Sequence, residues 1–585
     1  MYTAKQERIM QSKPLAVLLS IPLLVTTCLG QVGTTTRVSI SSSGEQGNGD
    51  LADMGMSSDA RYVVFRSQSD NLVLGDTNEE DDVFLRDRIT GVTTRVSIFN
   101  GLQSNGFCAR PKVSSAGPKV VFECWDWNNW IPGYFGTVYV HDASTGITSP
   151  LAVSSKGQLG NDQSSYCWIT ANGSYVVFSS AASNLVAGDT NNRTDVFLRD
   201  LLQSTTQLVS VGTAGSQQNG WIGLGQTASE DGRFIAFCSD GDNLVPGDNN
   251  ETYDVYLRDR LLSTTTRISV SSSGVEGNGM SDYPHVSADG RYVAFASDAS
   301  NFVPEDTNGA RDIFVRDTLA GVTTRVSIST FGNQSNGWSF FSSISQDGRF
   351  IGFDSEGSNL VPNDGNSASD AFLHDRLTGQ TMRVSVSSVG EEGNNHSGLS
   401  TTSSDGRIVA FVSHASNLVP GDTNNEEDVF VFDRSTLPPT SFVLQRGVLE
   451  QGDIGSFVYS DDIRAIFRPG VVFSTSQPPI ALVLESNSSQ PAGDELTFSV
   501  ESSTSSTAIT QFIEFYDFIS GAYDLLDQRP TSTTDALTVL SVSRDPERFF
   551  GPNNILRARV SFKAYGPLFA YPWRARLDRA SWTVR

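Results

Sequence analysis

Six short stretches of this chain carry the same oxygen-bearing side chains at the same spacing. In "NFVPEDTNGARDIFVRD", residues 301–317, Asp306, Asn308 and Asp312 lie within seven positions, directly ahead of an apolar run. The six sets are Asp76, Asn78 and Asp82; Asp189, Asn191 and Asp195; Asp248, Asn250 and Asp254; Asp306, Asn308 and Asp312; Asp364, Asn366 and Asp370; and Asp422, Asn424 and Asp428. Carboxylate and amide oxygens are the ligands that Ca²⁺ takes, and they also accept hydrogen bonds within turns.

Two roles therefore fit these sets. In the first, three side chains bind Ca²⁺ together with backbone carbonyls and water. In the second, the Asp and Asn side chains form local Asx turns that brace a long loop without a metal. Either role supports the fold. No His or Cys joins the sets, which argues against zinc or a redox metal.

The sets belong to a repeated unit. The phrase "SADGRYVAFAS" at 287–297 has close or looser copies that start at residues 57, 114, 170, 229, 345 and 403. Each unit contains four short apolar stretches separated by Gly-rich or polar turns, which predicts four strands. Four strands in a repeat of this length are typical of a β-propeller rather than a helical solenoid.

The two ends of the repeat region predict a closed ring. The last repeat supplies three strands, ending in "DVFVFDR" at 428–434, and an unpaired strand "TTTRVSI" stands alone at 34–40. If the N-terminal strand completes the last repeat, no sheet edge is left open. The sequence therefore predicts a seven-bladed β-propeller over residues 31–437.

Residues 438–585 lack the repeat and alternate apolar and polar residues, as in "ELTFSVESS" and "ILRARVSF". This pattern predicts a second all-β domain, a β-sandwich of the jelly-roll kind. The predicted fold class is all-β throughout.

The turn phrase S-x-D-G-R, followed by an apolar strand that ends in Phe, resembles the repeat of TolB-like, WD-repeat-like propellers. The resemblance covers all seven repeats and implies a propeller in a bacterial, exported protein. It leaves the ligand open, because that family includes peptidase-associated, lyase and protein-binding members.

The first 30 residues resemble a targeting segment. Three basic residues precede the apolar run "PLAVLLSIPLLVTT" at 14–27, which is too short to span a bilayer but fits a signal-peptide core. We expect a signal peptide over 1–30 with cleavage near Gly30, in preference to lipid attachment at Cys28. No later segment is predicted to cross a membrane. The expected location is secreted, cell-surface or periplasmic.

The net charge limits the classes of partner that the protein can bind, and the cysteine positions suggest one disulfide. The formal net charge of −24 argues against a nucleic-acid partner, because nothing neutralises phosphates. Cys108 and Cys124 lie eight residues on either side of Ala116, where we predict a hairpin turn. That symmetry makes them a candidate disulfide; the alternative is that these cysteines are buried free thiols.

In a four-stranded antiparallel repeat, the loop between the second and third strands and the linker to the next repeat emerge on the same face. We therefore expect the six sets and the linkers to lie on one face of the ring. In the second repeat, "CWDWNNWIPGYFGT" replaces the acidic set. Its aromatic residues, with two tryptophans that follow linkers, are candidates for binding a glycan or a protein partner: Trp125, Trp127, Trp130, Tyr134, Phe135, Trp221 and Trp338. The alternative is that the rings of the second repeat pack on one another in place of the acidic set.

No catalytic motif is found. The chain has five His residues and lacks a nucleophile elbow, a Gly-rich phosphate loop or a His-Glu metal helix. An Asp ends every third strand, and we predict that it accepts backbone N–H groups in a turn. The sequence favours an exported, non-enzymatic binding or scaffold protein with an acidic face braced by turns or Ca²⁺. The alternative is a propeller enzyme, a polysaccharide lyase or hydrolase that uses carboxylates at the channel mouth.

Overall fold

The computed structural model describes residues 33–115, 117–125, 136–434, 436–437, 439–452, 457, 464–471, 477–488, 495–564 and 573–584. The predicted signal peptide and Cys28 lie outside these residues, as do Ala116, Trp127, Trp130, Tyr134 and Phe135. Within the described part of the chain, no helix is long and apolar enough to cross a membrane.

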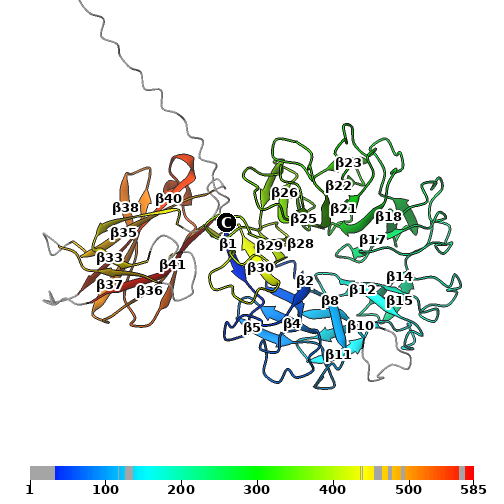
Figure 1. Cartoon of the computed structure of the whole chain (residues 1–585), viewed down its shortest axis with the longest axis horizontal. Helices are drawn as coiled ribbons and strands as arrows, with labels where there is room; N and C mark the ends of the chain where they lie inside the picture. The colour runs from blue at the N-terminus through cyan, green and yellow to red at the C-terminus, as the bar shows by residue number, and fades with distance from the viewer. Residues whose placement is uncertain are drawn as a thin grey trace, which may run out of the picture. The chain divides into compact units, whose positions relative to one another are not determined.

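The described residues up to 434 form seven four-stranded antiparallel sheets, numbered here in chain order (Figure 1). Sheets 1 to 3 contain β2 (Leu51–Met56), β3 (Tyr62–Ser67), β4 (Asp82–Asp87) and β5 (Val92–Arg95); β8 (Phe107–Val113), β9 (Lys119–Trp125), β10 (Thr137–Asp142) and β11 (Ile147–Pro150); and β12 (Ser164–Ile169), β13 (Tyr175–Ser180), β14 (Asp195–Asp200) and β15 (Thr205–Leu208).

Sheets 4 to 6 follow the same order. They contain β16 (Thr227–Ala228), β17 (Phe234–Ser239), β18 (Asp254–Asp259) and β19 (Thr264–Arg267); β20 (Ser281–Val286), β21 (Tyr292–Ser297), β22 (Asp312–Asp317) and β23 (Val322–Arg325); and β24 (Ser339–Ile344), β25 (Phe350–Ser355), β26 (Asp370–Asp375) and β27 (Gln380–Arg383). A two-stranded hairpin, β6 (Ile98–Phe99) and β7 (Leu102–Gln103), lies in the linker after sheet 1.

Sheet 7 draws on both ends of the repeat region. It contains β28 (Ser397–Thr402), β29 (Ile408–Ser413), β30 (Asp428–Asp433) and the N-terminal strand β1 (Thr34–Arg37). β1 pairs antiparallel with β30, from Thr34 opposite Asp433 to Arg37 opposite Phe430. Sheets 1 and 7 also share one hydrophobic core, so the series of sheets closes on itself as a β-propeller.

The two middle strands of each sheet are buried on both faces, as their continuous apolar runs predict. In sheet 5, Phe295 of β21 lies directly opposite Phe314 of β22, with ring centroids 6.0 Å apart. Equivalent stacked pairs occur in the other six sheets. Each fully buried aromatic side chain of this kind stabilises the fold by about 1.5–3 kcal/mol.

The S-x-D-G-R turn is closed by its own Asp, and its Arg joins it to the end of the third strand. In sheet 5, Ser287 Oγ and the Arg291 backbone N–H both donate to Asp289 Oδ1, at 2.6 and 3.0 Å. Arg291 then donates two bonds to Asp317 at the end of β22, from Nε at 3.1 Å and Nη2 at 2.7 Å. Asp317 also accepts the Leu319 N–H, which confirms its predicted turn role. The arginine partner was not predicted.

The arginines that pair with these carboxylates lower their pKa, so the stability of the fold depends on pH in the acid range. Hydrogen bonds from Arg61 and Arg291 lower the pKa of Asp87 and Asp317 to about 2. An unfolded Asp has a pKa of about 3.9, so both carboxylates stabilise the fold above about pH 4, and this contribution is lost as pH falls toward 2. We expect the melting temperature of the wild type to fall through this window, and that of Asp317→Asn to start lower and fall less steeply. Thermal melts from pH 5 to pH 2 test this, and parallel slopes would contradict it.

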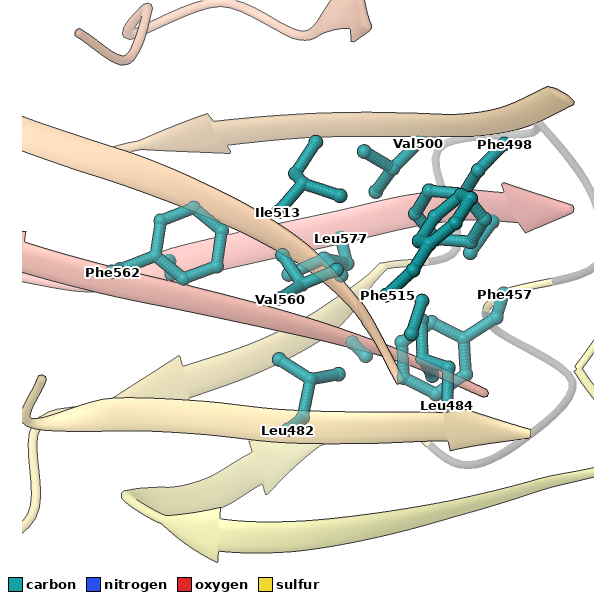
Figure 2. Close-up of a cluster of buried hydrophobic side chains, with 14 of the residues drawn as sticks. Phe457, Leu482, Leu484, Phe498, Val500, Ile513, Phe515, Val560, Phe562 and Leu577 are labelled. Carbon is teal, nitrogen blue, oxygen red and sulfur yellow. The ribbon is translucent and has the colours of Figure 1, made fainter. Parts of the chain in front are cut away.

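The described residues after Arg434 form two further antiparallel sheets. One contains β31 (Thr436–Leu437), β33 (Val448–Gln451), β34 (Ala465–Arg468), β36 (Leu496–Thr504), β39 (Ala536–Val542) and β41 (Ala575–Val584). The other contains β32 (Ser441–Arg446), β35 (Ile480–Asn487), β37 (Ile509–Asp517), β38 (Ala522–Pro530) and β40 (Ile555–Ala564), and two 3₁₀ turns span Pro546–Phe549 and Pro552–Asn554. Side chains of both sheets, including Phe498 and Val560, share one buried core (Figure 2).

The four cysteines that the structure describes divide into one pair and two single residues. Cys108 of β8 lies opposite Cys124 of β9, and a disulfide joins them. Cys167 and Cys238 are free and buried.

Candidate functional site

The six acidic sets lie in what we call the carboxylate loops, which join the second and third strands of sheets 1 and 3 to 7. Each loop is tied to the linker that follows its sheet. In sheet 5, Asn308 Nδ2 donates to the Ser335 carbonyl at 3.0 Å, and Gln334 Nε2 donates to Thr307 Oγ1 at 2.7 Å. Carboxylate loops and linkers therefore share one face, as predicted. We call it the long-loop face.

The sets form turns of the predicted kind. Asn308 Oδ1 accepts the Ala310 N–H at 3.2 Å, and Asn308 Nδ2 donates to Asp312 Oδ2 at 2.9 Å. Asp312 is 1% exposed, and its Oδ1 accepts from Ser327 Oγ. The same bonds to the last carboxylate of the set recur around Asp82, Asp195, Asp254, Asp370 and Asp428.

The asparagines of the sets were candidate Ca²⁺ ligands, but their side chains are engaged in turn hydrogen bonds. In every set the amide nitrogen donates to the last carboxylate and to a carbonyl of the linker, and the amide oxygen accepts the backbone N–H two residues on. The asparagines that make these three bonds are Asn78, Asn191, Asn250, Asn308, Asn366 and Asn424. A metal would have to share each oxygen with a backbone donor, so the turn role fits these residues better.

An arginine lies between the two carboxylates in five of the six loops. Arg325 Nη1 lies 3.0 Å from Asp306 Oδ1 and 3.1 Å from Asp312 Oδ2. The equivalent pairings are Arg95 with Asp76 and Asp82, Arg267 with Asp248 and Asp254, Arg383 with Asp364 and Asp370, and Arg37 of the N-terminal strand with Asp422 and Asp428. In these loops a guanidinium lies between the carboxylates that were candidate Ca²⁺ ligands. Sequence reasoning missed it, although the repeated Thr-Thr-Arg of the fourth strand was a signal.

Two sheets depart from this rule. In sheet 2, Pro150 stands opposite Tyr139 at the arginine position, and that sheet has no acidic set. In sheet 3, Leu208 stands opposite Phe197, yet Asp189 and Asp195 are both present. Sheet 2 thus lacks both the arginine and the acidic set, whereas sheet 3 lacks only the arginine.

Among the described residues, two groups of three carboxylates have a spacing that could hold a metal ion. They are Asp248, Asp254 and Glu276 in one group, and Asp364, Asp370 and Glu392 in the other. Arg267 pairs with all three carboxylates of the first group and Arg383 with all three of the second. Burial raises the pKa of Asp254 and Asp364 to about 6. The cost of burying these charges is therefore offset in part by the arginines.

The three candidate tryptophans that the structure describes, Trp125, Trp221 and Trp338, do not form one cluster. Trp125 of sheet 2 packs on Phe107, with ring centroids 5.4 Å apart. Trp221 and Trp338 precede the inner strands of sheets 4 and 6 and are 53% and 49% exposed. Arg193 of the preceding carboxylate loop lies 4.6 Å from the Trp221 ring centroid, which places Trp221 on the long-loop face. The three rings come from alternate sheets, and this explains their separation.

A row of aromatic rings leads from Trp338 into the inner strands. Trp338 lies 6.1 Å from Phe340, Phe340 lies 6.4 Å from Phe341, and Phe341 lies 4.7 Å from Tyr283 between ring centroids. Phe341 and Tyr283 have φ of 42° and 48° and lie where register shifts interrupt β24 and β20. Such bulges re-aim side chains. We call these four residues the aromatic row, and only Trp338 was predicted.

The inner strands also line a pocket of about 90 Å³, and Lys112, Trp168 and His285 are among its lining residues. Lys112 Nζ donates to the Met54 carbonyl at 2.8 Å, and burial lowers its pKa. His285 Nδ1 accepts the backbone N–H of Ile344 at 3.1 Å, and burial lowers the His285 pKa to about 4.

One wall of the inner strands carries charges of both signs. Arg110 forms an ion pair with the buried carboxylate of Glu123, and its backbone N–H donates to Asp53 Oδ2 at 3.4 Å. Lys112 interacts electrostatically with both carboxylates. Two carboxylates and two basic groups thus lie close together, and no sequence motif marked them.

Comparisons with known proteins give fold-level likeness at low identity. No family model and no curated protein matches the chain. Similar solved structures include a putative TolB from Agrobacterium tumefaciens, with 15% identity over 58% of this chain and 92% of that chain and a TM-score of 0.32. A GH74 enzyme from Niastella koreensis has 11% identity over 75% and 60%, with a TM-score of 0.37. The WD40 repeats of RRP9 have 8% identity over 69% and 99%, with a TM-score of 0.37.

The repeated S-x-D-G-R turn, the four-stranded antiparallel sheets and the closure by β1 are features of this chain itself. Together they are the features of a β-propeller, and its turn phrase resembles that of TolB-like, WD-repeat-like propellers.

Proposed function

We propose that this protein is an exported, non-enzymatic binding scaffold. Its seven sheets act as the blades of a propeller, followed by a β-sandwich, and its long-loop face binds a carbohydrate or protein ligand. The carboxylate loops hold that face in a fixed conformation, because each loop is bonded both internally and to the next linker. A rigid face lowers the entropic cost of binding.

The aromatic row is the observation that carries this proposal. Trp338 is half exposed, and a series of ring contacts runs from it through Phe340 and Phe341 to Tyr283 at the inner strands. Flat aromatic rings stack against the apolar faces of sugar rings, and nearby amides hydrogen-bond the hydroxyl groups. Asn336, two residues before Trp338, is exposed; its Nδ2 donates one bond to Ser358 Oγ at 3.1 Å, which leaves the second N–H of this amide for a hydroxyl group. A carbohydrate is therefore the ligand that this surface fits best.

A glycan array tests the proposal. We expect the wild type to bind a defined group of glycans and Trp338→Ala to lose about tenfold or more in affinity, as for a stacked aromatic anchor. Phe331→Ala is the matched control, because Phe331 is an exposed aromatic residue on the same linker, outside the aromatic row. Equal binding by the wild type and Trp338→Ala would exclude the aromatic row as the ligand site.

A second candidate function is a polysaccharide lyase or hydrolase. The grouping of Asp53, Glu123, Arg110 and Lys112 on the inner strands favours it, because such enzymes use paired carboxylates and a basic group. Glycans that bind in the array would then be shortened on incubation, with new reducing ends or unsaturated products. Glycans that stay intact after prolonged incubation would exclude the lyase or hydrolase activity and support binding without catalysis.

A further inference from the structure

The carboxylate loop of sheet 3 holds two acidic side chains without the arginine present in the other five. Leu208 of β15 occupies the register position that Arg325 occupies in β23. Asp195 is 0% exposed, and Asp189 is half-buried. The two carboxylates are close enough to interact electrostatically. Burying two like charges costs free energy, and a positive charge between them offsets that cost.

A second side chain in this loop differs from its counterparts. Gln218 stands where the equivalent linkers have Gly277, Ser335 or Gly393. It is 0% exposed, and its amide lies within hydrogen-bonding reach of the Asp195 carboxylate. Its Nε2 donates to the Thr194 carbonyl at 2.9 Å, whereas its Oε1 has no partner among the described residues. A buried amide oxygen without a donor calls for a cation or another ligand.

In the other five carboxylate loops, the positive charge is the guanidinium group of an arginine between the two carboxylates. Arg267 Nη1 lies 3.0 Å from Asp254 Oδ2, and its Nη2 donates to the Gly247 carbonyl at 2.8 Å. Arg95 makes the same kind of bond to the Gly75 carbonyl at 3.3 Å. In sheet 3 the equivalent carbonyl belongs to Gly188, which is exposed. The loop is therefore exposed to solvent at the residue next to Asp189.

We propose that a divalent cation of the Ca²⁺ class binds in the sheet 3 loop, where a guanidinium lies in the other five. The carboxylates of Asp189 and Asp195, the Gly188 carbonyl and Gln218 Oε1 are its ligands, and water completes the six to eight oxygens that Ca²⁺ takes. Asn191 Nδ2 and Ser210 Oγ already donate to Asp195 and hold its carboxylate in place. This site is independent of the aromatic row and of the proposed glycan binding.

Calorimetric titration of the chelator-stripped full chain with CaCl₂ tests the proposal. We expect one equivalent of Ca²⁺ to bind the wild type and none to bind Leu208→Arg, because the new guanidinium takes the position of the ion. The absence of binding to the folded wild type would overturn the proposal. Unchanged binding by Leu208→Arg would overturn it as well.

A second pair of variants decides the question if Leu208→Arg does not fold. Asp189→Asn removes one carboxylate from the sheet 3 loop, and Asp306→Asn makes the same change in a loop that contains an arginine. We expect Asp189→Asn to lose at least about tenfold in Ca²⁺ affinity and Asp306→Asn to bind as the wild type does. Equal losses in the two variants, or losses in Asp306→Asn alone, would contradict a site in sheet 3.

Discussion

A chain that begins at Ser41 is expected to lose the cooperative unfolding of the propeller. This truncation removes β1, which forms the outer strand of sheet 7, and leaves the edge of β30 unpaired. It also removes Arg37, which lies 3.3 Å from Asp422 and 3.2 Å from Asp428. Loss of a strand and of a buried ion pair amounts to several kcal/mol, a large part of a total stability of about 5–15 kcal/mol. Circular dichroism melts and size-exclusion chromatography measure the effect.

A synthetic peptide of residues 33–41 provides the control for this truncation. Added to the shortened chain, it should pair with β30 and raise the melting temperature. The same peptide with Arg37→Leu should restore less, because Asp422 and Asp428 then stay without their arginine. A shortened chain that melts at the wild-type temperature with the wild-type cooperativity would show that β1 does not close the ring.

The second large effect is expected from Arg325→Leu. The side chains of Asp306 and Asp312 are 4% and 1% exposed and pair with this arginine, which is itself 11% exposed. Removing one partner of a buried ion pair leaves an uncompensated charge, which costs about 3–5 kcal/mol. Urea unfolding in the presence of a chelator should therefore show a loss of this size in the free energy of unfolding.

Two further variants separate the charge effect from a packing effect. The double variant Asp306→Asn/Arg325→Leu should recover part of the lost stability, because one of the two unpaired carboxylates is gone. Arg544→Leu should change the free energy of unfolding by less than about 0.5 kcal/mol, because Arg544 is 96% exposed. A loss below about 1 kcal/mol in Arg325→Leu would mean that the arginine does not hold the loop.

The sequence was informative wherever interacting residues lie close in the chain or recur at the repeat period. The turns around Asn308 and Asp312 could be predicted because donor and acceptor are four residues apart. Strand order followed from seven copies of one pattern. The pairing of Arg325 with Asp312, 13 residues earlier on the preceding strand, requires the register of the sheet. The pairing of Arg37 with Asp428, 391 residues away, requires the closed ring.

The aromatic residues show a different limit. Phe340, Phe341 and Tyr283 lie in strands whose apolar residues look like ordinary core positions. The register shifts in β24 and β20 let these three rings contact one another instead. A bulge of this kind depends on contacts between neighbouring strands and leaves no local sequence signal. The candidate tryptophans were predicted for one face of the ring, and their repeat positions put Trp125, Trp221 and Trp338 in alternate sheets.

Every carboxylate loop is expected to hold a positive charge between its two carboxylates, an arginine in five loops and a cation in the loop of sheet 3. Anomalous diffraction from crystals grown with Mn²⁺ in place of Ca²⁺ tests this most directly. We predict one anomalous peak, between Asp189 and Asp195, and ordered guanidinium groups between the carboxylates of the other five loops. Peaks in several loops, or arginines turned out into solvent, would contradict the account.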